Sequence, residues 1–238
     1  MGVGWSRVRK SETRTYCMGK IKMTWELEQK IAVHVVKPGD ALWEDCLRTE
    51  YQVFVDSQYI PENPQKRLVD YDPYTHVEFL CATVGDEIAG TMRIIYAPDH
   101  SKMKFSLFPT IDSHEKLRFF PGKLDECMAM DPRQCIDIAA MVTVPKFRRN
   151  AKASKSIITR VMTRVWEQRP LRYAFAAIDT PFYEKLKRRD LPWLNLSEST
   201  MYWGSMTTAG VLDFFNILQG WQKVAIFFYR AKGLISRK

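Results

Sequence analysis

The residues best suited to chemistry surround an apolar run at residues 136–144. That run holds one carboxylate, Asp137, and the turn after it has four Lys or Arg within residues 146–152. Beyond the turn, residues 157–165 place aliphatic side chains on one helical stripe. A strand, a turn with small residues and a helix together present backbone N–H groups to a phosphate. The residues predicted to hold that phosphate are Arg148, Arg149, Ala151, Ala153 and Ser154.

The basic turn has a second interpretation, as the solvated start of an ordinary amphipathic helix, and the residues alone leave both open. From Lys146 to Arg172 there are nine Lys or Arg and a single acid, Glu167, in a chain of net charge +9. Such a segment attracts an acidic partner: nucleic acid, anionic lipid, a phosphorylated cofactor or an acidic protein. No nucleic-acid-binding motif is recognisable, so we do not expect nucleic acid as the partner.

Periodicity and turn residues predict one domain of mixed α and β structure over residues 31–205. A helix is expected over residues 40–54 with Asp40 as its N-cap, and another from Thr180 with Pro181 in its first turn. Residues 99–135 show no clean period and are expected to form a long loop. Strands are expected at residues 31–36, 77–84, 88–96, 136–144, 172–178 and 199–203.

The two ends are expected to be appendages of this domain. Residues 1–30 are predicted to form an N-terminal extension. Residues 206–238 are predicted to form a C-terminal unit with an amphipathic helix over residues 209–232. That helix could pack on its own domain, form a dimer contact or lie on a membrane surface, and the pattern leaves these uses open.

Cysteine usage and the lack of targeting signals predict a cytoplasmic protein, with peripheral attachment to the inner membrane as the variant. The five cysteines show no CxxC pair and no His at ligand spacing. This scatter is typical of reduced thiols and predicts no metal site. The start of the chain has no signal-peptide core, and no apolar run is long enough to span a bilayer.

The run and turn resemble the cofactor-binding motif of the GNAT superfamily of N-acyltransferases, an apolar strand followed by Arg/Gln-x-x-Gly-x-Gly/Ala. Here the motif reads Arg-Arg-Asn-Ala-Lys-Ala over residues 148–153, with Ala151 at the first glycine position. Residues 48–55, 70–72 and 90–93 occur in the order seen in acyl-homoserine lactone synthases. They also resemble the related long-chain N-acyl amino acid synthases.

The resemblance implies an α/β (α+β) fold, a GNAT-like mixed sheet flanked by helices. It also implies transfer of a long-chain fatty acyl group from acyl carrier protein to the α-amine of an amino acid. Asp137 falls where the lactone synthases carry Glu, and their Arg three residues later is replaced by Ala140. That replacement favours an N-acyl amino acid product. Three alternatives remain: a lactone synthase, a GNAT enzyme using acyl-CoA, and a non-enzymatic scaffold binding anionic lipid or nucleic acid.

Acyl transfer assigns expected roles to residues along the domain. Strand backbone at Val142 and Val144 is expected to hydrogen-bond the pantetheine arm of the thioester. Asp137 is expected to take the amine proton, or else to be a structural carboxylate bound to a neighbouring loop. Tyr183 is expected to protonate the departing thiolate, or else to be a core aromatic with a solvated hydroxyl.

The acceptor site is expected to use side chains from the first half of the domain. Arg93 and Arg48 can grip a carboxylate with their guanidinium forks, and Asp72 can attract an ammonium group. Phe54 is placed in the same site. Each charged residue could instead belong to a surface ion pair. The basic segment would dock the acidic carrier protein.

Overall fold

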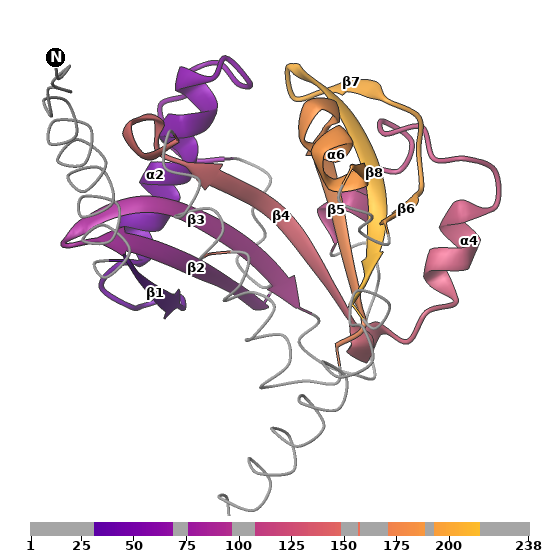
Figure 1. Cartoon of the computed structure of the whole chain (residues 1–238), viewed down its shortest axis with the longest axis horizontal. Helices are drawn as coiled ribbons and strands as arrows, with labels where there is room; N and C mark the ends of the chain where they lie inside the picture. The colour runs from indigo at the N-terminus through magenta and orange to yellow at the C-terminus, as the bar shows by residue number, and fades with distance from the viewer. Residues whose placement is uncertain are drawn as a thin grey trace, which may run out of the picture.

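The computed structural model describes residues 31–68, 76–96, 108–148, 157, 171–188 and 193–214. Within these residues eight strands form one sheet in the order β1-β2-β3-β4-β5-β8-β6, and β7 pairs with β8 (Figure 1). The strands are β1 (Ile31–Val36), β2 (His76–Val84), β3 (Glu87–Tyr96), β4 (Cys135–Thr143), β5 (Tyr173–Asp179), β6 (Trp193–Asn195), β7 (Thr200–Tyr202) and β8 (Ser205–Asp213). The helices are α2 (Trp43–Asp56), α3 (Pro109–Asp112), α4 (Lys123–Met128) and α6 (Thr180–Lys187).

The first half of the sheet is an antiparallel arrangement of β1, β2, β3 and β4. Its centre is the hairpin of β2 and β3, which turns at Gly85 with φ of +61°, a conformation that glycine adopts without strain. The expected hairpin is therefore confirmed. Gly90 on β3 also has a specific role, because a Cβ there would lie 2.6 Å from the Val142 carbonyl oxygen. The absence of a side chain lets β3 and β4 approach closely.

The second half of the sheet joins the first through β4 and β5, and this junction is short. The two strands are parallel but pair at only three positions, from Cys135 with Tyr173 to Asp137 with Phe175. Beyond Asp137 they diverge (Figure 1). A register shift in the β3–β4 ladder falls at the same place, since Arg93 pairs with Ala140 and the next residue pairs with Ile138. Ala139 is thus the extra residue of a β-bulge, which bends β4 away from β5.

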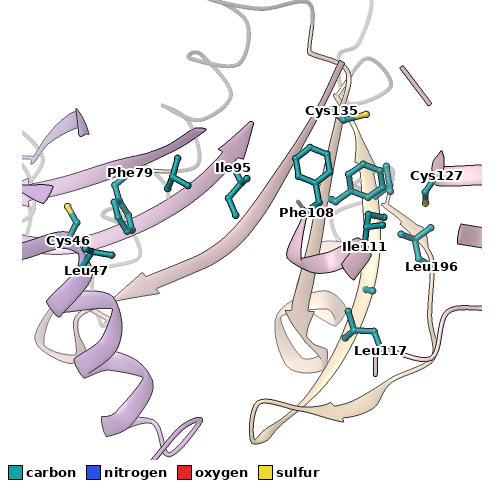
Figure 2. Close-up of a cluster of buried hydrophobic side chains, with 14 of the residues drawn as sticks. Cys46, Leu47, Phe79, Ile95, Phe108, Ile111, Leu117, Cys127, Cys135 and Leu196 are labelled. Atoms are coloured by element: carbon teal, nitrogen blue, oxygen red, sulfur yellow. The ribbon is translucent and has the colours of Figure 1, made fainter. Parts of the chain in front are cut away.

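Both faces of the sheet are buried at β2 and β3, which explains the nearly continuous apolar runs in these strands. On one face α2 places Cys46 and Leu47 against Phe79 of β2, while Phe108 and Ile111 lie beside the second half of the sheet (Figure 2). We call this the α2 face. The opposite face holds a second apolar cluster that includes Ile157 and residues of β2, β3, β4 and β5.

Two predictions about the helices and loops of the domain need correction. Asp40 is not the N-cap of α2, because Leu42 holds that position and the Asp40 carboxylate instead accepts the Lys37 N–H at 2.7 Å. The long loop expected over residues 99–135 is interrupted, within its described part, by α3, α4 and a 3-10 turn at Pro132–Gln134. Both helices are short, four and six residues, so neither leaves a helical period in the sequence.

The helix predicted to begin at residue 209 does not begin there. Ser205–Asp213 form β8, which pairs with both β5 and β6, so the sheet continues past the predicted domain boundary at residue 205. A short buried apolar run fits a strand and a helical stripe equally well, which is why periodicity misled here. Residues 215–238, which hold most of the predicted helix, lie outside the described residues, as does the extension at 1–30. Among the helices that are described, none has the length and apolar character needed to cross a bilayer.

Replacing Gly210 by Ala is expected to destabilise the second half of the sheet by about 1–3 kcal/mol. A Cβ at this position of β8 would lie 2.2 Å from the indole nitrogen of Trp193 on β6, so the ring would have to move. Chemical denaturation measures the loss. The double variant Gly210→Ala/Trp193→Leu restores space and should recover part of it. Equal stability of Gly210→Ala and the wild type would contradict this packing.

Candidate functional site

The place where β4 and β5 separate is the first element of the site. Val144 donates its N–H to the Ala89 carbonyl at 3.0 Å, so Val144 and Ala89 are a hydrogen-bonded pair of the antiparallel ladder. Such pairs alternate along a ladder. Val142 therefore also directs its backbone groups toward β3, whereas Met141 and Thr143 direct theirs toward the side of β5. A ligand lying along this edge would meet the peptide groups of Met141 and Thr143. The predicted roles of Val142 and Val144 in binding the pantetheine arm stay predictions.

Arg148 is the described member of the predicted phosphate turn. Its Nε donates to the Thr143 carbonyl at 3.0 Å, and its Nη2 donates to Ser57 Oγ at 3.1 Å. This cation is thus held at the end of β4, beside the C-terminus of α2. Lys146 forms an exposed ion pair with Glu87. The other four predicted phosphate ligands lie outside the described residues: Arg149, Ala151, Ala153 and Ser154.

Asp137 is the last residue of β4 that pairs with β5, and it is completely buried. Its Oδ2 accepts the Thr110 N–H at 2.9 Å, at the N-terminus of α3. This is the contact that a structural carboxylate would make. Asp137 also lies where β4 and β5 begin to diverge, and its role as a proton acceptor stays a prediction.

Arg93 lies on β3, directly across from Ala140 of β4, on the α2 face. Its side chain is 2% exposed, and Nε is 3.3 Å from a carboxylate oxygen of Glu50, which is 1% exposed. The sequence suggested a guanidinium projecting to a ligand, but this one is held in the interior by α2. The role of Arg93 in binding the acceptor stays a prediction.

Replacing Glu50 by Ala is expected to destabilise the protein by roughly 3–5 kcal/mol, because it leaves the Arg93 charge buried without its counter-ion. Urea unfolding measures the loss. The double variant Glu50→Leu/Arg93→Met should restore most of the stability, since apolar replacement of a whole buried pair is often neutral. Asp45→Ala, which removes only the exposed pair with Arg48, is the control and should cost less than about 1 kcal/mol. A loss of less than about 1 kcal/mol in Glu50→Ala would contradict the role of Glu50 as the buried counter-ion of Arg93.

Two other residues, Arg48 and Asp72, were predicted to bind the acceptor. Arg48 is 67% exposed on α2 and pairs with Asp45 at 3.1 Å, so it faces solvent in the arrangement that a surface ion pair would give. Asp72 lies outside the described residues. The predicted roles of Arg48 and Asp72 in acceptor binding therefore stay predictions.

Tyr183 lies in α6, the helix that follows the diverging end of β5, and Pro181 stands in the first turn as expected. The Tyr183 hydroxyl oxygen accepts a hydrogen bond from Asn195 Nδ2 at 2.9 Å, and its ring lies 6.5 Å from that of Trp193. Because the oxygen is an acceptor in this contact, the phenol proton is available to another group. The role of Tyr183 as a proton donor stays a prediction.

A polar and aromatic cluster at the outer end of β5 was not found by sequence reasoning. Asp179 ends β5; its Oδ2 accepts from the Tyr59 hydroxyl at 2.9 Å and its Oδ1 from Ser205 Oγ at 2.7 Å. The ring centroid of Phe54 is 5.7 Å from those of both Tyr59 and Trp203. Phe54, which contacts both of these rings, is the one member of the cluster that the sequence analysis placed in the acceptor site. The others come from three distant segments with no shared motif.

No family model matches the sequence, and no curated protein matches it. Solved structures do match. They include the CoA-dependent acyl-homoserine lactone synthase BjaI with SAM and isopentyl-CoA, at TM-score 0.57 and 16% identity over 84% of this chain and 90% of that one. The fold resembles known N-acyltransferases. The protein has a GNAT-like fold, as its sequence motifs predicted.

Two further solved structures share this GNAT-like fold. LasI, a lactone synthase, matches at TM-score 0.57 and 10% identity, over 77% of this chain and 90% of that one. FeeM, an N-acyl amino acid synthase from uncultured soil microbes, matches at TM-score 0.52 and 13% identity, over 79% of this chain and 94% of that one. Likeness at such identities establishes the arrangement of strands and helices, and the chemistry has to be argued from this chain's own residues.

Proposed function

We propose that this protein is an N-acyltransferase that joins a long-chain acyl group, carried as a thioester on acyl carrier protein, to the α-amine of an amino acid. One observation carries the proposal. β4 and β5 pair at only three positions and then diverge, with a bulge at Ala139, so the β4 edge beyond it turns away from its parallel neighbour. An extended pantetheine arm could lie along that edge as an additional strand.

In this proposal the donor is held by backbone and by one cation. Met141 and Thr143 direct peptide groups toward the arm, and one of these N–H groups faces the thioester carbonyl to stabilise the oxyanion. Arg148, at the end of β4, binds the phosphate together with the turn that follows it. A carrier-protein arm has a single phosphodiester, which is a smaller demand than the diphosphate of CoA and suits a turn with Ala151 in place of glycine.

The reaction then needs one proton acceptor and one proton donor. Asp137 takes the proton of the acceptor ammonium, directly or through water, and the neutral amine attacks the thioester carbonyl. The new N–C bond forms as the C–S bond breaks. Tyr183 gives its proton to the departing thiolate and regains one, through water, from the nitrogen of the new amide, which loses its surplus proton. An amino acid is favoured over a lactone-forming substrate because β4 carries Ala140, which is 7% exposed, where the resembling lactone synthases carry Arg.

Parallel incubations with two donors test the proposal. Purified protein is supplied with decanoyl carrier protein or decanoyl-CoA and a mixture of the common L-amino acids. Free thiol release is followed, and products are identified by mass spectrometry. We expect an N-decanoyl amino acid, with the carrier protein as the better donor. Thiol release with CoA alone would move the assignment to a CoA-dependent enzyme. No acylated amine with either donor would refute acyl transfer to an amino acid.

Transfer from the carrier protein is expected to weaken about tenfold between low salt and roughly 0.5 M NaCl, because docking of an acidic partner on the basic segment is screened. The measured quantity is kcat/KM for decanoyl carrier protein. Decanoyl pantetheine, which has no protein to dock, should show little change. Charge reversal at Lys152 and Lys155 should reproduce the effect at low salt, whereas reversal at Lys66 and Lys116 is the matched control. Salt-independent kcat/KM would count against this docking.

A further inference from the structure

The Asp179 carboxylate links the segment after α2 to the hairpin of β7 and β8. It stands at the diverging end of β5 and is half-buried. Each of its oxygens accepts one hydrogen bond, from Tyr59 and from Ser205. Burial and the hydrogen bond to this carboxylate raise the pKa of Tyr59, so the phenol keeps its proton and donates it in this contact. A carboxylate has about four lone-pair sites, so two or so remain for a ligand.

A group of aromatic rings is connected to this carboxylate through Tyr59, whose hydroxyl donates to it. Phe54 makes edge-to-face contacts with Tyr59 and Trp203, and Tyr202 stacks on Trp203 with centroids 6.0 Å apart. All four rings are half-buried and therefore reach the surface with part of their area. A carboxylate attracts a cation by its charge, and the faces of nearby aromatic rings attract an organic cation through their quadrupoles.

The backbone holds these rings in place before any ligand arrives. Trp203 and Gly204 form the two-residue turn between β7 and β8 and have φ of +48° and +71°. A Cβ on Gly204 would lie 2.9 Å from the Gln58 carbonyl oxygen, so only glycine allows the hairpin to press against the segment after α2. The hairpin tip and the α2 segment are thus fixed against each other, and the site is preorganised.

The cluster is connected to the proposed donor site. Arg148, the phosphate-binding candidate, donates to Ser57 at 3.1 Å, and its charge opposes the rise in the pKa of Tyr59. Residues 57–59 therefore lie between the end of β4 and the end of β5. A molecule bound at Asp179 would sit at the open end of the diverging strands, on the α2 face that also carries Asp137 and Tyr59.

We propose that the Asp179 carboxylate, with the rings of Phe54 and Trp203, binds the ammonium group of the acceptor amine before transfer. This inference rests on the proposed function and names the recognition site for its second substrate. Tyr59 and Ser205 are positioning residues, because each orients the carboxylate with a hydrogen bond. In this proposal the amine binds first at Asp179, near the surface. Asp137, which is fully buried, then takes its proton.

The competing interpretation is a purely structural role, in which Asp179 only connects the segment after α2 to the hairpin of β7 and β8. A structural role and a binding role predict different responses to added amines. If the role of Asp179 is only structural, added amines should not bind there. Removing the carboxylate should then lower the stability of the protein and should not change the KM of one substrate more than that of the other. A binding site distinguishes a cation from a neutral molecule of the same shape.

Amine binding is measured by NMR on protein with ¹⁵N-labelled tryptophan, following the indole N–H of Trp203, which is assigned with Trp203→Phe. The probes are L-leucinamide, which is protonated at about pH 6.5, and 4-methylpentanamide, which has the same side chain without the ammonium group. We expect a saturable shift with the cation, with a dissociation constant in roughly the millimolar range, and no saturable shift with the neutral amide. Equal shifts from both, or none from either, would overturn the proposal.

Variants of the site sharpen the result. Asp179→Asn should weaken L-leucinamide binding about tenfold, whereas Tyr59→Phe, which keeps the carboxylate, should weaken it less. In acyl-transfer assays Asp179→Asn should raise the acceptor KM about tenfold and leave the donor KM unchanged. Unchanged binding in Asp179→Asn would refute the site. If that variant fails to fold, the comparison of the two probes on wild-type protein still decides.

The two proposals fail separately. Saturable binding of L-leucinamide that depends on Asp179, with no thiol release from any donor, would leave the ammonium site in place and refute acyl transfer. Acyl transfer with an acceptor KM that is the same in wild type and Asp179→Asn would retain the enzyme and refute the ammonium site.

Discussion

Replacing Tyr183 by Phe is expected to lower kcat for acyl transfer by roughly 10²–10⁴-fold, the usual contribution of a general acid. The change removes only the hydroxyl that would protonate the alkyl thiolate. The ring contact with Trp193 is kept, and Asn195 loses one half-exposed hydrogen bond, so the fold should persist. Thiol release from decanoyl carrier protein measures the loss.

A better leaving group separates this role from a structural one. An aryl thioester, such as the 4-nitrothiophenyl ester of decanoate, departs without a proton, so Tyr183→Phe should be nearly as fast as the wild type with that donor. Tyr173→Phe on β5 is the matched control and should leave both rates unchanged. An equal loss with alkyl and aryl thioesters would exclude Tyr183 as the acid.

Asp137→Asn is expected to lower turnover on a similar scale, about 10²-fold or more, with the fold retained. Asn keeps an oxygen that can accept the Thr110 N–H, so α3 stays attached to β4. What is lost is the ability to take a proton from the ammonium. Hydroxylamine, a nucleophile that is neutral at the assay pH, should be acylated by this variant at a rate close to that of the wild type.

Asp137→Ala provides the comparison for stability. It removes the acceptor altogether and leaves the Thr110 N–H buried, at a cost of about 1–3 kcal/mol in the free energy of unfolding. Full turnover of Asp137→Asn with an amino-acid acceptor would remove Asp137 from the mechanism and assign it the structural role alone.

The sequence predicted most of the sheet because its central strands carry strong local signals. The Gly85 turn between two β-branched runs marks the hairpin, and Pro181 marks the start of α6. It failed where an element is short or where an apolar run fits two periods. Thus α3 and α4 were taken for loop, and β8 was taken for the start of a helix, because only pairing with β5 and β6 decides its conformation.

The sequence identifies β4 as the strand that carries the candidate site, but the direction of each peptide group on it is decided by the fold. Whether Met141 or Val142 faces the β5 side depends on the β3–β4 register and on the bulge at Ala139, which no local pattern reveals. The burial of Arg93 depends on Glu50, a residue of α2 far away in the sequence. The Asp179 cluster is assembled from three such segments, so it appears only in the folded chain.

The two halves of the sheet also differ in when they can form. β2, β3 and β4 pair with their neighbours in chain order, so these contacts can form while the polypeptide is still being synthesised. β5 must wait for β8, whose last paired residue is Asp213. Until β8 has left the ribosome, β5 has no antiparallel neighbour, and Asp179 can gain Ser205 as a partner only when the first residue of β8 has emerged. A nascent chain shorter than this is expected to hold a folded first half and no acceptor site, so catalytic competence would be the last property the protein acquires.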